Sequence, residues 1–412
     1  MTELKFIHAA DLHLDSPFLG MQQLPAALWQ RLHDAPFQAV KRLVATAIEQ
    51  QVDFVVLVGD LFDRETQSIR AQVFLAEQLQ LLIDHHISVF VSYGNHDHLT
   101  ENHVLTLPTE VAVFSADVET KHFTTQTGER VAISGFSYPQ RWLETNMVTH
   151  FPERGTVDYQ IGLLHGAIKQ GDENHYAPFT VSELQATHYD YWALGHIHKP
   201  QLLASQPEIV YAGTIQGRNK LEDGPHGFEL VSSSTGQLHA EFIRADQFEW
   251  LTLNIQVNAD TTDESLMSQV ENAIIDAKQS VFGLIELQIS GIETLSPALV
   301  SRLTDGTWLA RFDQQQRRRY DEQGAWVYSI SVAAPKQTVT YAQLDAKYWA
   351  QAGDAVFTPD NLQQTAGRLM QYDFLATHIK QDETLKAITE AAKTELFNQA
   401  RLEEEQDADH QA

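Results

Sequence analysis

The chain has 412 residues, enough for roughly two or three domains, and a domain of about 250 residues can bury a substantial core. It contains no cysteine, which excludes disulfides, iron–sulfur clusters and thiolate zinc sites and leaves His, Asp, Asn and Glu as possible metal ligands. The 28 Lys and Arg residues against 55 Asp and Glu residues give a formal net charge of −27, which argues against nonspecific attraction of nucleic acid to the whole surface.

The N-terminal stretch MTELKFIHAADLHLD contains Lys5 and Asp11, so its apolar run is too short for a secretory signal. No window of the sequence approaches the length of an apolar membrane span. We therefore expect a soluble, cytoplasmic protein with no membrane partner.

The first hundred residues alternate between strand and helix patterns. The short apolar runs predict strands at residues 5–10, 54–58 and 87–92. The helical spacing of apolar residues predicts amphipathic helices over 25–50 and 68–85, the second capped by Ser68. The first strand, the first helix and the second strand form a βαβ unit, and the second strand has the composition of one buried on both faces.

The next part of the chain is richer in strand patterns. Residues 111–135 contain short strand patterns separated by turn residues, which predict a β-rich second half of the fold. Further strands are expected at residues 159–164, 191–194, 209–213, 227–231 and 238–243. We assign residues 1–246 to one domain.

A smaller α+β unit follows over residues 247–335. It is predicted from a strand, a helix and two more strands, at residues 248–257, 263–280, 284–290 and 326–332. Arg317, Arg318 and Arg319 form its most basic point, and a solvated helix face or a phosphate-contacting patch explains them equally well. Residues 336–412 read as a polar connection, helix-prone segments and an acidic tail; the helices either pack on the body or dock a partner.

Side chains that bind metals recur at the ends of the predicted strands. In chain order they are Asp11, His13, Asp60, Asn95, His96, His165, His196 and His198. Carboxyl ends of strands are where open α/β sheets bind ligands. Residues two apart on extended chain share a face, so Asp11 with His13, and His196 with His198, can each point at one place. These residues fall into five short motifs, one after each of five predicted strands. Any one of these motifs alone is more often a turn or loop feature, but the five together predict a metal centre.

The donor set contains only nitrogen and oxygen, which suits Mn²⁺, Fe²⁺ or Zn²⁺ rather than an all-oxygen Ca²⁺ site. Two ions about 3.5–4 Å apart can bind a phosphoryl group and activate a water molecule. We expect Asp60 to be shared by the two ions. His96 is the candidate catalytic acid, and Asp97 is expected to orient it.

The motifs D-x-H, GDLFD, GNHD, LLHG and GHIH resemble, in order and kind, those of the calcineurin-like metallophosphoesterase superfamily, over about residues 4–245. The opening HAADLHLDSPF and the order of the later parts look most like its SbcD/YhaO branch of DNA-repair exonucleases. The resemblance implies a four-layer α-β-β-α sandwich, an α+β capping domain and a helical C-terminal tail. Several nucleases of this branch have a histidine where Asp63 stands, so the role of Asp63 is left open.

The resemblance also implies a set of ligands and partners. One metal takes Asp11, His13, Asp60 and His198, and the other takes Asp60, Asn95, His165 and His196, with manganese as the usual ion and His96 assisting catalysis. The implied function is a Mn²⁺-dependent DNA exonuclease subunit with an SMC-like ATPase partner of the SbcC/YhaN type, compatible with a homodimer. The alternatives are a phosphoesterase acting on a small nucleotide or phosphoprotein, and a noncatalytic scaffold.

Overall fold

The computed structural model describes residues 4–18, 20–21, 23–63, 68–99, 107–169, 175–277 and 280–332, with single positions 356, 358, 361, 365, 367, 384, 388, 389 and 392. The chain divides into two compact units. The first comprises Met1–Leu251, Gln279–Leu284 and Gly324–Tyr328; the second comprises Thr252–Lys278, Ile285–Gln323 and Ser329–Ala412. The predicted connection and helical tail over 336–412 lie almost entirely outside the described residues.

The first unit contains a six-stranded sheet built on the predicted βαβ unit. Its strand order is β12-β11-β1-β2-β3-β4. The strands are β1 (Lys5–Ala9), β2 (Phe54–Val58), β3 (Ser88–Ser92), β4 (Ala112–Val113), β11 (Gly227–Ser234) and β12 (Gln237–Arg244). β1 to β4 pair in parallel, and every residue of β2 is buried, which confirms the predicted central strand.

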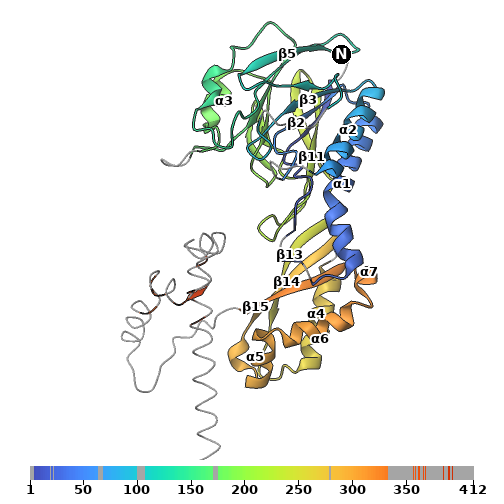
Figure 1. Cartoon of the computed structure of the whole chain (residues 1–412), viewed down its shortest axis with the longest axis vertical. Helices are drawn as coiled ribbons and strands as arrows, with labels where there is room; N and C mark the ends of the chain where they lie inside the picture. Colours follow the sequence, from blue (N-terminus) through green and yellow to red (C-terminus); the bar gives the residue numbers. More distant parts are fainter. Residues whose placement is uncertain are drawn as a thin grey trace, which may run out of the picture. The chain divides into compact units, whose positions relative to one another are not determined.

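Two helices cover one face of this sheet. α1 (Ala26–Glu49) and α2 (Ile69–Asp84) lie side by side against it (Figure 1). The Ser68 hydroxyl accepts a hydrogen bond from the Ala71 backbone N–H at 3.1 Å, which confirms the predicted N-cap. Apolar side chains of both helices, such as Leu43 and Leu79, pack on the side chains of β1 and β2 that face them. This packing fixes the sheet edge from which the candidate metal ligands extend.

A second six-stranded sheet forms the predicted β-rich layer. Its order is β5-β6-β7-β8-β10-β9. Its strands are β5 (Glu119–Thr124), β6 (Arg130–Gly135), β7 (Tyr159–His165), β8 (Tyr191–Gly195), β9 (Gln201–Ser205) and β10 (Glu208–Tyr211). The outer face carries the short helices η1 (Met147–His150) and α3 (Val181–Ala186), which the sequence patterns did not predict.

The two sheets pack on each other through a buried apolar layer. Alternate residues of the strands supply it, and Phe6 and Phe54 stack with ring centroids 4.7 Å apart. Valine, isoleucine and leucine side chains of β6 and β7 face them from the second sheet. Helices, two sheets and helices therefore form four layers, which confirms the α-β-β-α fold class.

A third sheet has three strands in the order β13-β14-β15, with β13 (Phe248–Gln256), β14 (Phe282–Ser290) and β15 (Ala325–Val332). The first part of each strand belongs to the first unit and the rest to the second unit. The helices of the second unit are α4 (Asp263–Asp276), η2 (Ile292–Thr294), α5 (Pro297–Thr304), α6 (Thr307–Gln316) and α7 (Tyr320–Gln323). Among these, α4 ends four residues before the predicted limit, and the sequence patterns predicted none of the other helices.

The basic triplet follows α6 on the surface of this unit. Arg317, Arg318 and Arg319 are all exposed, and Arg319 forms an ion pair with Glu271 of α4 at 3.2 Å. This contact favours a solvated helix face for Arg319. Within the described ranges, no helix is both long and apolar enough to cross a membrane.

Candidate metal centre

The predicted ligands extend from the carboxyl ends of neighbouring strands in both sheets. In the first sheet, Asp11 and His13 follow β1, Asp60 follows β2, and Asn95 and His96 follow β3. In the second sheet, His165 ends β7 opposite Gly195 of β8, and His196 and His198 come next along the chain. Since parallel strands end at the same edge, the fold collects all eight side chains there.

One group of side chains gathers around His13. Its Nε2 atom lies 3.2 Å from Nε2 of His198, 3.9 Å from Oδ1 of Asp11 and 3.8 Å from Oδ2 of Asp60. Asp11, His13 and His198 each offer a ligand atom within 4.8 Å of the others, so this group could hold a metal ion. Asp11 and His13 are completely buried or nearly so.

A second group gathers around His165. Its Nε2 atom lies 3.0 Å from Oδ1 of Asn95 and 3.4 Å from Oδ2 of Asp60. The same Asn95 oxygen lies 3.2 Å from Nδ1 of His196. Asp11, Asp60 and His165 form the second set of ligand atoms within 4.8 Å of one another. Asp60 Oδ2 thus faces His13 on one side and His165 on the other.

The chemistry of this cluster fits divalent cations. Asp60 Oδ2 is buried and has no hydrogen-bond partner among the described residues. Burial raises the pKa of Asp11 to about 6, and burial together with the charge of Asp60 raises the pKa of Asp97 to about 7. Several carboxyl groups in one buried place are costly to ionise without added positive charge, which bound cations would supply.

The backbone at the strand ends is strained where the ligands lie. Asp11, His13, Asp60 and His196 have φ values of 52°, 40°, 50° and 96°, in the left-handed region that non-glycine residues rarely adopt. Such strain concentrates at functional sites. At Gly94, a Cβ atom would lie 2.2 Å from Oδ1 of Asp60, so the glycine before Asn95 is needed for close approach.

His96 lies at the edge of the cluster. Its backbone N–H donates to Oδ1 of Asp60 at 2.9 Å, and its ring Nδ1 lies 2.8 Å from the backbone carbonyl oxygen of Asp63. A carbonyl oxygen only accepts, so Nδ1 carries the proton and, in the neutral ring, Nε2 carries the lone pair. The His96 and His13 rings meet edge to face at 5.1 Å between centroids.

The prediction that Asp97 orients His96 is wrong. The Asp97 carboxylate accepts hydrogen bonds from the backbone N–H groups of Gly94, at 2.8 Å, and Leu61, at 2.6 Å. Its carboxylate therefore connects the loop after β2 to the loop after β3. The bond to His96 comes instead from the Asp63 backbone, which no side-chain pattern could reveal.

The sequence of this chain is similar to those of several known proteins. Residues 4–200, which include all eight side chains, match the family model for calcineurin-like phosphoesterases. The metallophosphoesterase YhaO of Bacillus subtilis is 40% identical over 277 residues, covering 66% of this chain and 68% of that protein. The chain belongs to the calcineurin-like phosphoesterase family.

Two further similar proteins each match just over half of the chain. The DNA double-strand break repair protein Mre11 of Archaeoglobus fulgidus is 29% identical over 235 residues, which are 52% of this chain and 50% of that protein. The crystal structure of a dimetal phosphatase from Danio rerio covers 55% of this chain and 92% of its own, with 12% identity and a TM-score of 0.35. Membership of the calcineurin-like phosphoesterase family implies a hydrolase of phosphoesters that uses divalent metals.

In this calcineurin-like phosphoesterase, three further charged side chains border the metal centre. His198 Nδ1 lies 2.8 Å from Oε1 of Glu222 and 2.9 Å from Nη2 of Arg218. Arg218 Nη1 lies 2.8 Å from Oδ1 of Asp63. Burial raises the pKa of Glu222, but the hydrogen bond from His198 and the charge of Arg218 outweigh it and lower that pKa to about 2. Sequence reasoning missed Arg218 and Glu222 because they belong to no strand-end motif.

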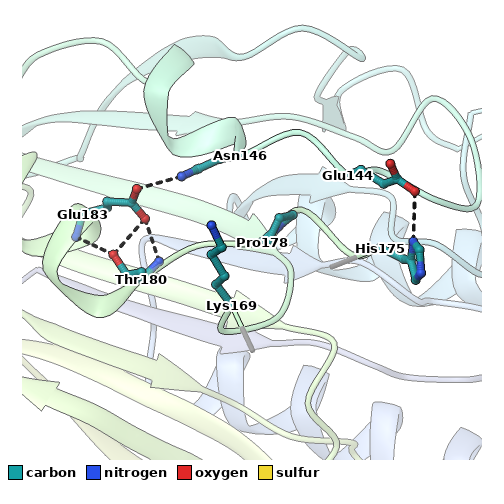
Figure 2. Close-up of a pocket in the computed structure, with 7 residues that line it drawn as sticks. All are labelled: Glu144, Asn146, Lys169, His175, Pro178, Thr180 and Glu183. Carbon is teal, nitrogen blue, oxygen red and sulfur yellow. Dashed lines mark hydrogen bonds and ion pairs between the residues drawn. The ribbon is translucent and has the colours of Figure 1, made fainter. Parts of the chain in front are cut away.

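A pocket of about 410 Å³ opens between the loops after β6 and β7. Figure 2 shows its lining residues, which are Glu144, Asn146, Lys169, His175, Pro178, Thr180 and Glu183. Its carboxylates are engaged by the protein itself: Glu144 by His175 at 3.0 Å, and Glu183 by Asn146 at 2.8 Å. Next to His175 in the chain, the Tyr176 ring packs on His196 with centroids 4.5 Å apart, so Tyr176 borders the candidate metal centre.

Proposed function

We propose that the chain is a two-metal phosphodiesterase, namely a Mn²⁺-dependent DNA exonuclease subunit that acts in DNA repair. The observation that carries this proposal is the convergence of seven nitrogen or oxygen ligands and His96 at one edge of two sheets. Similarity to repair proteins named Mre11 supports DNA as the substrate. Manganese is proposed because the ligands suit it and because it is the usual ion of the family that the sequence resembles.

In this proposal, Asp11, His13, Asp60 and His198 hold one cation, and Asp60, Asn95, His165 and His196 hold the other. Asp60 is the shared ligand because its Oδ2 atom faces both His13 and His165, at 3.8 and 3.4 Å. When bound, divalent cations polarise the phosphoryl group and supply a nucleophilic hydroxide near neutral pH.

The protein's own contribution to the reaction is position and proton transfer. Strained turns hold Asp11 and Asp60 in place before substrate arrives, so little reorganisation is needed. His96, held by the Asp63 carbonyl through Nδ1, keeps Nε2 for the substrate. When protonated there, His96 can give its proton to the leaving 3′ oxygen.

The proposal includes an SMC-like ATPase of the SbcC/YhaN type as partner, in the cytoplasm, and allows a homodimer. The formal net charge of −27 requires that DNA contact be local, around the positive charge of the metal centre, or be supplied by the partner. This makes the isolated chain a weak DNA binder.

The deciding experiment measures cleavage of labelled single- and double-stranded DNA with Mn²⁺, with and without a co-expressed SMC-like ATPase. We expect Mn²⁺-dependent release of nucleotides that Asp60→Ala and His96→Ala abolish while the fold survives. Cleavage at the wild-type rate in either variant would contradict the proposal. Far faster turnover of cyclic nucleotides or phosphopeptides than of DNA would replace it with a small-substrate phosphoesterase, and no activity with any metal would favour a scaffold.

A further inference from the structure

We infer that Glu222 and Arg218 are positioning residues of the metal centre. Glu222 selects the form of His198 whose Nε2 atom can bind a cation. Arg218 joins the Glu222 carboxylate to Asp63 in the loop after β2, whose backbone carbonyl oxygen accepts a hydrogen bond from His96. Both residues lie in the segment between β10 and β11. The inference deepens the proposed function and rests on the proposed metal centre.

In its neutral form His198 carries a ring proton on either Nδ1 or Nε2. Its Nδ1 atom lies within hydrogen-bond distance of Glu222 Oε1, at 2.8 Å, and of Arg218 Nη2, at 2.9 Å. An arginine nitrogen only donates and a carboxylate only accepts, so Nδ1 either donates to Glu222 or accepts from Arg218. The two arrangements correspond to different tautomers of the ring.

The orientation of the His198 ring decides between these tautomers. Nε2 is the His198 atom that faces the cluster, 3.2 Å from Nε2 of His13. A cation bound there takes the Nε2 lone pair, so the proton must be on Nδ1. Glu222 is then the partner that can receive it, and the Arg218 guanidinium bonds the same carboxylate instead, at 3.1 Å. A carboxylate in this place favours the metal-binding tautomer and raises the basicity of the ring.

The Glu222 carboxylate is itself held in place by hydrogen bonds. It is 7% exposed, and its Oε2 atom accepts a hydrogen bond from the Arg218 backbone N–H at 2.7 Å. Asn219 donates to its Oε1 atom at 3.2 Å. With these bonds the carboxylate cannot rotate away from His198, so it sets the orientation of the ring as well as its tautomer.

Arg218 also contacts the loop after β2. Arg218 Nη1 lies 2.8 Å from Oδ1 of Asp63, and both side chains are 14% exposed. The backbone carbonyl of Asp63 accepts from His96 Nδ1, and its carboxylate lies 3.6 Å from Nδ1 of His13. Arg218 therefore connects the loop after β2 to His198. A residue important only for folding would stabilise the protein without changing its affinity for metal.

The test measures Mn²⁺ binding to the full chain by calorimetry, together with the thermal midpoint of the metal-free protein. We expect Glu222→Ala to weaken Mn²⁺ binding about 10- to 100-fold, the range for outer partners of metal ligands. Glu222→Gln keeps an accepting oxygen but loses the charge, so a smaller loss of about threefold to tenfold is expected. The matched control is Asp223→Asn, next in the chain, whose exposed carboxylate pairs with Lys199 and should leave Mn²⁺ affinity unchanged.

Arg218→Ala should lower Mn²⁺ affinity as well, and Arg218→Lys should restore it only partly because lysine cannot bridge two carboxylates with one planar group. Raising Mn²⁺ should recover hydrolysis in these variants, whereas a folding defect would not respond. Folded Glu222→Ala and Arg218→Ala proteins with wild-type Mn²⁺ affinity would overturn the inference. If Glu222→Ala does not fold, wild-type affinity in Glu222→Gln and Arg218→Lys overturns it equally.

The outcomes separate this inference from the proposed function. Weakened Mn²⁺ binding in the variants, with no DNA cleavage even by the wild type, would support the positioning role and contradict the nuclease. A wild-type chain that binds no Mn²⁺ would overturn both. DNA cleavage by the wild type with unchanged Mn²⁺ affinity in every variant would contradict the positioning role alone.

Discussion

The Nε2 atoms of His13 and His198 lie 3.2 Å apart although 185 residues separate them in the chain. Two neutral imidazoles at this distance can form one N–H···N hydrogen bond if their tautomers differ. A cation bound by both rings would instead take the Nε2 lone pair of each. The approach of these two atoms is therefore compatible with the proposed metal centre.

Removal of metal should lower the stability of the protein. Chelation removes the positive charge that bound cations would place beside the buried Asp11 and Asp60 carboxylates, and a ligand present at 100 times its Kd stabilises the native state by about 2.7 kcal/mol. We expect a lower thermal midpoint after dialysis against chelator and recovery when Mn²⁺ is restored. Equal midpoints with and without Mn²⁺ would show that no such binding occurs.

Asp60→Asn should lower affinity for Mn²⁺ by at least about 100-fold, since the loss of a shared ligand should exceed the loss of an outer partner. The variant keeps the size of the side chain but removes the charge that faces His13 and His165. Calorimetric titration with Mn²⁺ measures the effect. Asp117→Asn, at an exposed position, is the control, and similar affinities in the two variants would argue against Asp60 as a ligand.

His96→Gln should reduce kcat for phosphodiester hydrolysis by about 10²- to 10⁴-fold, the usual contribution of a general acid or base. Binding of Mn²⁺ should persist, because His96 meets Asp60 through its backbone N–H rather than through its ring. Steady-state kinetics at saturating Mn²⁺ separates the two effects. His122→Gln, exposed on β5, should behave as the wild type. An unchanged kcat in His96→Gln would remove it from the mechanism.

Phe54→Ala should destabilise the protein by about 3–5 kcal/mol, the range for large-to-small changes in a core. Phe54 is completely buried between the sheets, stacks on Phe6 and meets Phe90 edge to face. Denaturant unfolding measures the loss. Leu202→Ala, at a side chain 56% exposed, should change the free energy of unfolding by less than about 0.5 kcal/mol. Comparable losses at both positions would contradict the four-layer packing.

Glu229→Gln should stabilise the protein at pH 8 but not at pH 4. Burial, with a contribution from the charge of Glu208, raises the pKa of Glu229 to about 7. The folded state therefore favours protonated Glu229. The contribution of Glu229 to stability is fully present below the unfolded pKa near 4.5 and is lost as the pH rises through 7. Glutamine cannot ionise, so the free energy of unfolding of Glu229→Gln should exceed that of the wild type by on the order of 1–3 kcal/mol at pH 8.

The measurement for this variant is denaturant unfolding at both pH values. Glu241→Gln, at an exposed position of the neighbouring strand β12, is the control and should show no such pH dependence. A gain at pH 8 that is equally large at pH 4 would mean that the effect does not come from ionisation of Glu229.

The sequence alone determined most of the strands, the helices α1, α2 and α4, and the residue types that could bind metal, but not the other helices. The apolar run of β2 and the helical spacing of α1 are local patterns, and local patterns are what burial on one or both faces imposes on a chain. Glycine precedes Asp60, Asn95 and His196 in the sequence, and the structure gives the reason: a Cβ atom at any of the three glycines would lie within 2.3 Å of another atom.

Only the tertiary structure decided which atoms meet. Whether Asp60 Oδ2 faces both His13 and His165 depends on the pairing and packing of two sheets, which residue spacing does not encode. The same holds for the bond from His96 to the Asp63 backbone, which replaced the expected contact with Asp97, and for Arg218 and Glu222, which lie outside every motif. Side-chain chemistry is a property of each residue, whereas the distance between two side chains depends on the whole fold.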